Sequence, residues 1–427
     1  KNLGIKVPDL VKGVRGMSNE FKVIEPLEKG LLRAMFNLHV FRDATIRYEM
    51  LNAPLTHFKP WEIGTPVARL RELGYVADIH QEPLVSDQQM LELFPQDVVI
   101  NDEAGDFFVR VTQFVDELLL RFYRTKELHA IKDRHQLVGE LVLGLAPHTS
   151  AAVVGRIVGY TKARVGFCHP YFHLAKRRNI DGDQDSMMLL SDGLLNFSHQ
   201  YLPTHRGGRM DAPLVFTVTL APNEIDDEIY EMETVWEYPL ELYEKTQRPI
   251  APEAVTMERV KNRLGKETQY SNIGYTHETN QFDAGPVRSK YVTLQTMAEK
   301  IKTQAKLQQK IMALDFKDSL EIVMMSHFLP DLIGNTRSFA RQSVRCTKCN
   351  SKYRRVPLRG KCTKCSGNLI LTINEGGVKK YLEIAKEMIR VYDLSDFLKQ
   401  RIILVEEEIN AVFKPEKTKQ KALFEFA

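Results

Sequence analysis

The sequence predicts an α+β protein of several domains, in which a strand-rich part precedes a zinc ribbon and helices. Its 427 residues are 43% hydrophobic and 27% charged. That describes a globular chain long enough for about two or three domains. Short apolar runs broken by Gly, Pro and charged residues dominate 151–219, and runs of helical period lie on either side of a four-cysteine segment at 346–365.

The first part of the chain is expected to begin with strands and continue with helices. Residues 1–75 contain short strand-like runs separated by Gly and Pro. A capping signal at Asn101 and Asp102 opens an amphipathic stretch whose apolar face is interpreted as core. The expected elements are a hairpin with strands at 38–41 and 45–50 around a turn at 42–44, a helix over 101–123, and a second helical stretch over 132–145.

The middle of the chain is expected to form a small closed barrel or a sandwich, because its strand-like runs are short and separated by turn residues. These runs cover 153–160, 163–167, 186–190 and 214–220. Helices are expected over 291–315, 378–392 and 395–412, and the basic residues 414–427 are interpreted as a flexible tail.

Charge and hydropathy limit the possible locations and partners. The net charge is only +4, but 337–364 holds ten basic residues and no acidic one, whereas 210–244 holds acidic residues and no basic one. A basic block attracts phosphates, although a solvated basic face fits the charge pattern equally well. No apolar run approaches the roughly 18 residues of a membrane span, and no secretory start is present, so we expect an intracellular protein without membrane contact. Because the chain begins at Lys1 without Met, it is expected to be part of a longer protein.

Four cysteines predict a metal site. Cys346, Cys349, Cys362 and Cys365 form C-x2-C-x12-C-x2-C, in which each CxxC turn presents two thiolates to one tetrahedral cation. Two disulfides are the alternative, but they fit poorly with an intracellular chain. The pattern therefore favours a structural zinc ribbon. The fifth cysteine, Cys168, is expected to be packed rather than reactive.

Three carboxylates at alternate positions predict a second metal site. Asp181, Asp183 and Asp185 surround a glycine bend, and alternate residues of an extended segment share one side. Carboxylate oxygens suit a hard divalent cation such as Mg²⁺, which also offsets their mutual repulsion. Three cations, Lys176, Arg177 and Arg178, come directly before. A metal next to cations is what phosphoryl or nucleotidyl transfer requires.

Two other interpretations of this segment remain open. A calcium loop of EF-hand type would have Gly at its sixth position and Glu at its twelfth, where this sequence has Ser186 and Asp192. An acidic surface turn fits these residues, taken alone, about as well as a metal loop does.

Longer blocks of sequence carry a family resemblance. They are 144–150 (GLAPHTS), 165–173 (VGFCHPYFH), 175–179 (AKRRN) leading into Asp181-Gly182-Asp183, and 206–214 (RGGRMDAPL), with similar segments at 26–30 and 56–60. Together these blocks resemble the large subunit of the archaeal family D DNA polymerase. The likeness runs through most of the chain.

The resemblance implies a double-psi β-barrel catalytic core with helical insertions, like that of multisubunit RNA polymerases, followed by a C-terminal zinc ribbon and helices. It implies Asp181 and Asp183 as catalytic Mg²⁺ ligands, with Asn179 and Asp185 as supports in the same loop. A companion barrel that supplies lysines is expected upstream of Lys1. The expected segments are 1–100, a strand-rich barrel or clamp-associated region; 101–145, helical; 146–290, the catalytic barrel; 291–340, a helical connector; 341–375, the zinc ribbon; 376–413, C-terminal helices; and 414–427, the tail.

Further residues are expected to contact nucleic acid or partners. Primer-template DNA or nucleotide contacts are expected from Lys176, Arg177, Arg178, Arg206 and Arg209, with a solvated face or a structural turn as the alternative. His148, His169 and His173 are interpreted as satisfied core residues rather than ligands. The tail resembles a sliding-clamp-binding box through Gln420, Leu423 and Phe426. By resemblance, the zinc ribbon and its flanking helices dock the small exonuclease subunit.

The sequence is therefore interpreted as the catalytic large subunit of a replicative DNA polymerase that adds dNTPs to a primer 3′-hydroxyl with Mg²⁺. The 3′ to 5′ exonuclease site would belong to the small subunit, and the location would be the archaeal cytoplasm, at the nucleoid. Two alternatives stay open: a fragment similar to the largest subunit of RNA polymerase, and a non-catalytic scaffold between clamp and small subunit.

Overall fold

The computed structural model describes residues 25–202, 209–210, 212–221, 225–276, 281–288 and 290–413. It divides into two compact units, Lys1–Arg288 and Ser289–Ala427, and each is described by itself. Four residues of the sequence analysis, Arg206, Gln420, Leu423 and Phe426, lie outside the described residues, as does the whole tail at 414–427.

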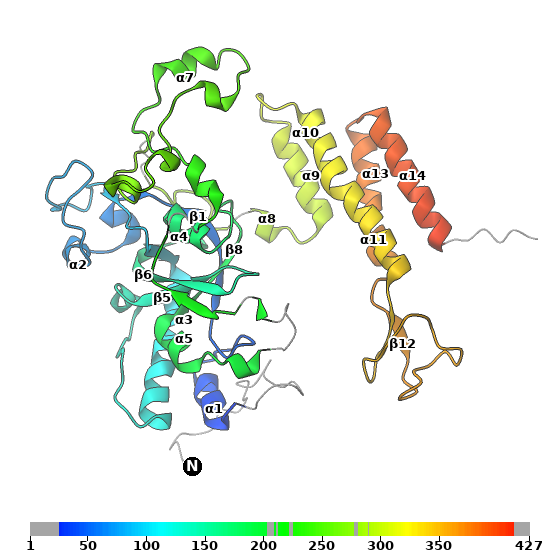
Figure 1. Ribbon diagram of the computed structural model, residues 1–427, viewed down its shortest axis with the longest axis horizontal. Coiled ribbons are helices and arrows are strands. Elements are labelled where there is room, and N and C mark those ends of the chain that lie inside the picture. The colour runs from blue at the N-terminus through cyan, green and yellow to red at the C-terminus, as the bar shows by residue number, and fades with distance from the viewer. Residues whose placement is uncertain are drawn as a thin grey trace, which may run out of the picture. The chain divides into compact units, whose positions relative to one another are not determined.

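Six strands of the first unit close into a barrel (Figure 1). Neighbouring strands follow one another around the ring in the order β4, β7, β1, β8, β5 and β6, and β6 pairs back with β4. Two of the pairs are parallel, β1 with β7 and β4 with β6, and the others are antiparallel. The strands are β1 (Tyr48–Pro54), β4 (Asp97–Asn101), β5 (Leu141–Leu145), β6 (Ala151–Thr161), β7 (Val165–Cys168) and β8 (Gln184–Leu189), and β9 (Val215–Thr217) extends the sheet beside β6.

A long helix covers one side of the barrel. Asn101 ends β4 and accepts a hydrogen bond from the backbone N–H of Ala104, so it caps helix α3 (Asp102–Glu117). Apolar residues at helical spacing, among them Phe108, Val111 and Phe114, are fully buried in the largest core cluster. The predicted helix over 101–123 is confirmed, with its last turn in the π-helical segment η2 (Leu118–Phe122).

The helical stretch predicted for 132–145 is wrong. Only a single 3₁₀ turn, η3 (Arg134–Leu137), forms there, and strand β5 follows after a short turn. Val142 and Leu143 are fully buried, and β5 pairs with both β6 and β8. An apolar run this short suits a buried strand as well as a helix, and the two neighbouring strands decide between them.

The predicted hairpin over 38–50 is also wrong in part. The backbone N–H of Phe41 donates to the carbonyl of Thr45, which gives the expected turn, but 38–41 is not a strand and β1 starts only at Tyr48. Helix α1 (Leu27–Met35) forms earlier in the segment expected to be strand-rich. Its Arg33 is buried and pairs with Glu25, so tertiary contacts stabilise a helix too short to persist alone.

Shorter elements complete the first unit. β2 (His57–Phe58) pairs with β3 (Leu91–Glu92) beside η1 (Pro60–Ile63) and α2 (Val67–Glu72). Two helices frame β8 along the chain, α4 (Pro170–Ala175) before it and α5 (Leu190–Asn196) after it. The others are η4 (His199–Tyr201), η6 (Asp227–Glu231), α7 (Leu240–Lys245), η7 (Pro252–Ala254), η8 (Val260–Asn262) and η9 (Glu267–Gln269).

The second unit is a helical bundle with a small three-stranded ribbon that follows α11 (Figure 1). The single helix predicted for 291–315 is two shorter ones, because Thr296 and Glu299 form a capping box that starts a new helix. The helix predicted for 378–392 is likewise divided, whereas the one at 395–412 is confirmed. The elements are α8 (Lys290–Thr293), α9 (Met297–Gln308), α10 (Phe316–Val323), η10 (Met324–Phe328), α11 (Leu329–Arg341), β10 (Val344–Cys346), β11 (Lys352–Tyr353), β12 (Leu369–Leu371), α12 (Glu375–Lys379), α13 (Leu382–Val391) and α14 (Asp396–Phe413).

Among the described residues, no helix has both the length and the apolar character needed to cross a lipid bilayer.

Candidate active site

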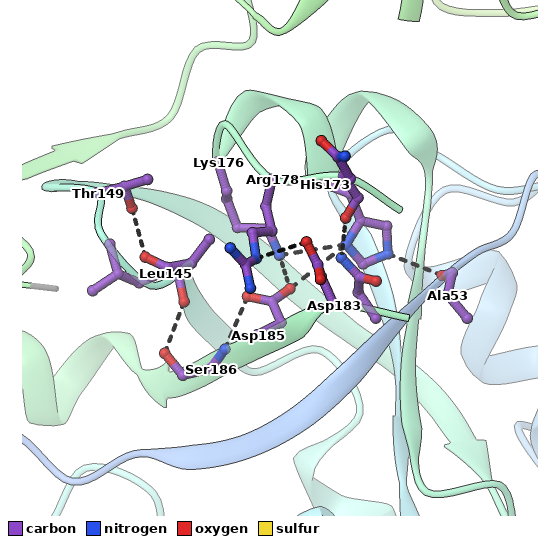
Figure 2. A network of polar contacts seen from close by, with 12 residues as sticks. Ala53, Leu145, Thr149, His173, Lys176, Arg178, Asp183, Asp185 and Ser186 are labelled. Atoms are coloured by element: carbon purple, nitrogen blue, oxygen red, sulfur yellow. Dashed lines mark hydrogen bonds and ion pairs between the residues drawn. The ribbon is translucent and has the colours of Figure 1, made fainter. Parts of the chain in front are cut away.

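The acidic segment of the sequence is a loop between α4 and β8 (Figure 2). Asn179 and Asp181 are exposed, and Asp183 is half-buried. Asp185 differs from them, because β8 begins at Gln184 and Asp185 is fully buried within the strand. The three carboxylates therefore do not share one side as the alternation predicted. The loop presents two of them to solvent and keeps the third inside.

Asp185 belongs to a buried polar network (Figure 2). Its carboxylate forms an ion pair with the Lys176 ammonium, and the Nδ1 atom of His173 lies 3.6 Å from the same oxygen. Burial by itself would raise the pKa of Asp185, but the Lys176 ammonium outweighs burial and holds the pKa below its usual value. Asp185 is therefore ionised, and its charge is compensated inside the protein.

The protonation of His173 follows from its neighbours. Its Nε2 atom lies 2.9 Å from the carbonyl oxygen of Ala53 in β1, so Nε2 carries the proton and donates. Burial and the nearby Lys176 lower the pKa of His173, so the ring is neutral. Its unprotonated Nδ1 faces the Lys176 ammonium at 3.5 Å. The network thus ties α4 to both β1 and β8.

The basic residues before the loop separate into two environments. Lys176, expected to contact phosphate, is only 1% exposed, and its ammonium serves Asp185 instead. Arg177 is exposed, and the Nε atom of Arg178 lies 3.1 Å from the carboxylate of Asp183. Arg209 is exposed as well. The cations that remain near the surface are therefore arginines, which bind phosphate in bidentate fashion.

The three histidines also differ from one another. His169 and His173 are fully buried, as expected for core residues, and so is Cys168, whose thiol pKa is raised by burial. His148 is exposed, with a left-handed backbone (φ 66°), so its assignment to the core is wrong. It lies in the turn after β5.

A polar residue that the sequence analysis did not single out lies beneath the loop. Asn52 of β1 is 2% exposed, and its side-chain amide donates to the carbonyl of Asn179 at 2.6 Å. Its side-chain oxygen accepts from the N–H of Gly182 at 3.1 Å, and its own N–H donates to the carbonyl of Asp183 at 2.9 Å. The signal in the sequence was a lone amide within an otherwise largely apolar strand.

A small cavity lies beside the start of β8. Its volume is about 180 Å³. Asp185 forms part of its wall, together with Glu49 of β1 and Arg47 just before that strand. The lining residues are Phe41, Arg47, Glu49, Ala146, Pro147, Gln184, Asp185 and Ser186.

The four cysteines of the ribbon gather as predicted. Their Sγ atoms all lie within 4.8 Å of one another, and the closest pairs, Cys349 with Cys362 and Cys346 with Cys365, are 3.4 and 3.5 Å apart. A tetrahedral zinc with Zn–S bonds of about 2.3 Å needs sulfur atoms about 3.8 Å apart, so the thiols fit this ion. Within the described ranges, no other group of three or more His, Cys, Asp or Glu residues is close enough to hold a metal.

Comparison with known proteins agrees with this arrangement. A family model described as the DNA polymerase II large subunit DP2, catalytic domain, matches residues 4–300 and so includes the barrel and the acidic loop. The chain belongs to this family. A second model, the zinc finger domain of DNA polymerase-epsilon, matches residues 340–399. The four-cysteine cluster and this second match together support bound Zn²⁺.

Curated relatives extend the family likeness to the whole chain. DNA polymerase II large subunits of Methanococcus maripaludis and Methanothermobacter thermautotrophicus are 49% and 50% identical over 100% and 99% of this chain. The large subunit of Pyrococcus furiosus is 50% identical over 97%. The chain spans only 38%, 39% and 33% of the length of these three relatives.

The loop of this family member has the donor chemistry that Mg²⁺ requires. Mg²⁺ takes oxygen ligands, keeps several waters, and is held in polymerases by one or two carboxylates together with substrate phosphates. Asp181 and Asp183 offer two carboxylates at the surface, and Asn179 adds an amide oxygen. Asp185 is engaged with Lys176 and is not needed for such a set. The residues present therefore fit a hydrated divalent cation.

A glycine beside the zinc ligands gives a first prediction. A Cβ atom at Gly367 would lie 2.9 Å from the Sγ of Cys346 and 2.8 Å from the Cβ of Lys348. We expect Gly367→Ala to displace a ligand and to weaken zinc binding about tenfold or more, since ligand geometry controls affinity. Competition with a chromogenic chelator measures this. Gly376→Ala, whose nearest neighbour would be at 3.6 Å, is the matched control. Equal zinc affinity in both variants would contradict the prediction.

Two buried histidines of the first unit, which contains the barrel, give a second prediction. Burial lowers the pKa of His169 to about 3 and of His57 to about 4. The unfolded chain takes up these protons below pH about 6.5, while the folded chain does not, so stability is complete above that pH and is lost as the pH falls. At pH 5 each of the two histidines should lower the free energy of unfolding by about 2 kcal/mol. Urea unfolding followed by the fluorescence of Trp61 and Trp236, both in this unit, measures the loss.

The variant that isolates this effect is His169→Asn. His169 caps α4 by accepting from the N–H of Tyr171, and an Asn oxygen serves equally well as a cap. We expect this variant to lose about 2 kcal/mol less than wild type between pH 7 and pH 5. His80→Asn, at an exposed position, should leave the pH dependence unchanged. An unchanged slope in His169→Asn would mean that His169 is protonated in the folded chain.

Proposed function

We propose that this chain supplies the metal-binding loop at which a DNA polymerase adds nucleotides to a primer 3′-hydroxyl. The observation that carries the proposal is the loop of Asn179, Asp181 and Asp183, with two accessible carboxylates above a closed barrel, in a chain of the DNA polymerase II large subunit family. Both family matches are to DNA polymerases, which favours DNA synthesis over an activity similar to RNA polymerase.

We also propose that the barrel is of the double-psi type. Its ring of six strands contains two parallel pairs, β1 with β7 and β4 with β6, whose β7 and β4 are neighbours. Exchanging β1 with β6, β7 with β4 and β8 with β5 returns the same ring, which is the pseudo-twofold arrangement expected of two interlocked halves. This symmetry supports the fold that the family resemblance implied.

In the proposed mechanism, Asp181 and Asp183 would hold Mg²⁺, and Asn179 would support them. Mg²⁺ bound there would lower the pKa of the attacking hydroxyl and neutralise charge on the phosphates. Arg178 neutralises Asp183 while no substrate is present, and it is free to turn to a phosphate when a cation takes over the carboxylate. Lys176 pairs with the buried Asp185 carboxylate, so the charge at the start of β8, directly after the loop, is compensated.

The partners follow from the family and from charge. We propose that primer-template DNA and dNTPs bind near Arg177, Arg178 and Arg209, that the zinc ribbon and C-terminal helices dock a small exonuclease subunit, and that the tail binds a sliding clamp. On the ribbon, Lys348, Arg354 and Arg355 are among the exposed cations, so this face suits an acidic partner or phosphates. Tethering to a clamp would raise the local concentration of the enzyme at the primer end.

The test is primer extension by the full-length large subunit assembled with its small subunit. Wild type is compared with Asp181→Asn and Asp183→Asn at fixed Mg²⁺, and primer-template binding is measured in parallel. Loss of synthesis with intact binding supports catalysis at this loop. Unchanged synthesis would place the active site elsewhere and favour a scaffold role for the chain.

A further inference from the structure

One side chain of the barrel holds the acidic loop at two points. Asn52 donates to the carbonyl of Asn179 at one end of the loop and accepts from the N–H of Gly182 at the bend. Its backbone N–H donates to the carbonyl of Asp183, which continues the ladder between β1 and β8 by one residue beyond Gln184. Three hydrogen bonds from one residue therefore fix the loop on both sides of Asp181.

We propose that Asn52 is a positioning residue that sets the separation and direction of the Asp181 and Asp183 carboxylates before a divalent cation binds. The inference deepens the proposed function and rests on it, because it concerns the same loop. The hydrogen bonds of the Asn52 side chain go to backbone groups of the loop, so it acts on the metal through the geometry of the chain.

An amide is the group that this position requires. The site must offer a donor to the Asn179 carbonyl and an acceptor to the Gly182 N–H at the same time, and among short side chains only Asn presents both from one rigid plane. Asn52 is 2% exposed, so an unsatisfied partner would be costly. Gly182 has a left-handed backbone (φ 95°), which turns its N–H toward the strand.

The second support of the loop comes from the next residue of β1. The carbonyl of Ala53 accepts from His173, whose ring faces the Lys176–Asp185 ion pair (Figure 2). Asn52 therefore fixes the loop, and Ala53 fixes the end of α4 before it. The loop carries two accessible carboxylates whose repulsion would spread them apart without a metal. Without the Asn52 amide, the repulsion between the two carboxylates would move them apart, and a cation would have to order the loop when it binds.

The experiment measures metal binding at the loop directly. Fe²⁺, added with ascorbate and peroxide, replaces Mg²⁺ and cleaves the backbone near the site where it binds. The full-length large subunit is end-labelled and assembled with the small subunit, so that only cuts in the large subunit are detected. Wild type is expected to be cut near Asn179–Asp183, with competition by excess Mg²⁺. In Asn52→Ala the half-saturating Fe²⁺ concentration is expected to rise about tenfold, which is about 1.4 kcal/mol. The Mg²⁺ concentration for half-maximal primer extension should rise equally, and the rate at saturating Mg²⁺ should recover.

The matched control is Asn101→Ala. Asn101 is also a buried asparagine of the barrel, 1% exposed, but it lies at the start of α3, which it caps, and not beneath the loop. Its loss should lower the unfolding free energy by about 1 kcal/mol and leave metal affinity within twofold of wild type.

The outcomes separate the two proposals. If wild type shows no cleavage near the loop, or Asp181→Asn retains synthesis, the proposed function fails. If wild type is cleaved at the loop but Asn52→Ala binds Fe²⁺ as tightly as wild type, only the positioning role fails. An equal loss of affinity in Asn101→Ala would also overturn that role, because the effect would then be a general result of destabilising the barrel.

Discussion

Primer extension is expected to fall at least about a thousandfold when Asp181 and Asp183 are both replaced by Asn, which corresponds to about 4 kcal/mol of lost transition-state stabilisation. The reason is charge. Each substitution keeps the size and hydrogen-bonding shape of the side chain but removes one negative ligand, so the loop no longer offsets the charge of a divalent cation. Asp185 does not replace them, since its carboxylate is buried and paired with Lys176.

The variants should fold as wild type does. Asp181 is exposed and Asp183 half-buried, so their unfolding free energies should change by less than about 0.5 kcal/mol. Single-turnover extension with pre-bound primer-template separates chemistry from DNA binding. Asp87→Asn, an exposed carboxylate on another loop of the same unit, is the control and should retain full activity. Synthesis within tenfold of wild type in the double variant would rule out these two residues as the metal ligands.

The Lys176→Met variant is expected to lose about 3 to 5 kcal/mol of unfolding free energy, since it leaves the Asp185 carboxylate buried without a cation. Gly144 lies beside the lysine stem and the Phe172 ring lies under its ammonium, so Met fills the same space and the effect is mainly one of charge. The double variant Lys176→Met/Asp185→Leu removes both charges and should recover most of the loss. Urea unfolding followed by tryptophan fluorescence measures all three proteins.

The same variants decide between two roles for Lys176. If the lysine bound phosphate, as the sequence pattern predicted, Lys176→Met would leave stability unchanged and reduce the salt dependence of DNA binding by about one charge. The buried ion pair predicts the reverse, a large loss of stability with the salt dependence unchanged. Losses below about 1 kcal/mol in both Lys176→Met and Asp185→Leu would contradict the ion pair.

Local patterns in the sequence predicted much of the candidate site. The spacing of Cys346, Cys349, Cys362 and Cys365 predicts a metal site because two CxxC turns need only a hairpin to meet. Helix α3 was predicted from the capping signal at Asn101 and from its period, and helix α14 from its period, and both signals act within a few residues. Asp181 and Asp183 were singled out for the same reason, since they are close along the chain, whereas Asn179 was implied by the family resemblance.

The sequence predictions that were wrong, and the residue that the sequence analysis missed, depend on contacts between residues far apart along the chain. Residues 132–145 have a helical pattern by themselves, but 141–145 form β5 because β6 and β8 lie on either side of that strand. Lys176 was grouped with Arg177 and Arg178 as one basic run, but only Lys176 points inward. Asn52 gave no motif, because its partners lie 127 and 130 residues away along the chain.

By itself, the sequence determined the chemistry available to this protein: four thiols for zinc, accessible carboxylates for a hard cation, and cations beside them. Only the tertiary structure decided how that chemistry is divided. In the folded chain, Asp185 and Lys176 form a buried ion pair. Asp181 and Asp183 stay at the surface, and Asn52 lies beneath them. The physical reason is that the closed ring of strands brings together residues that are far apart along the chain. Those residues decide whether a charge is buried and which group accepts or donates each hydrogen bond, and the spacing of residues along the chain does not show this.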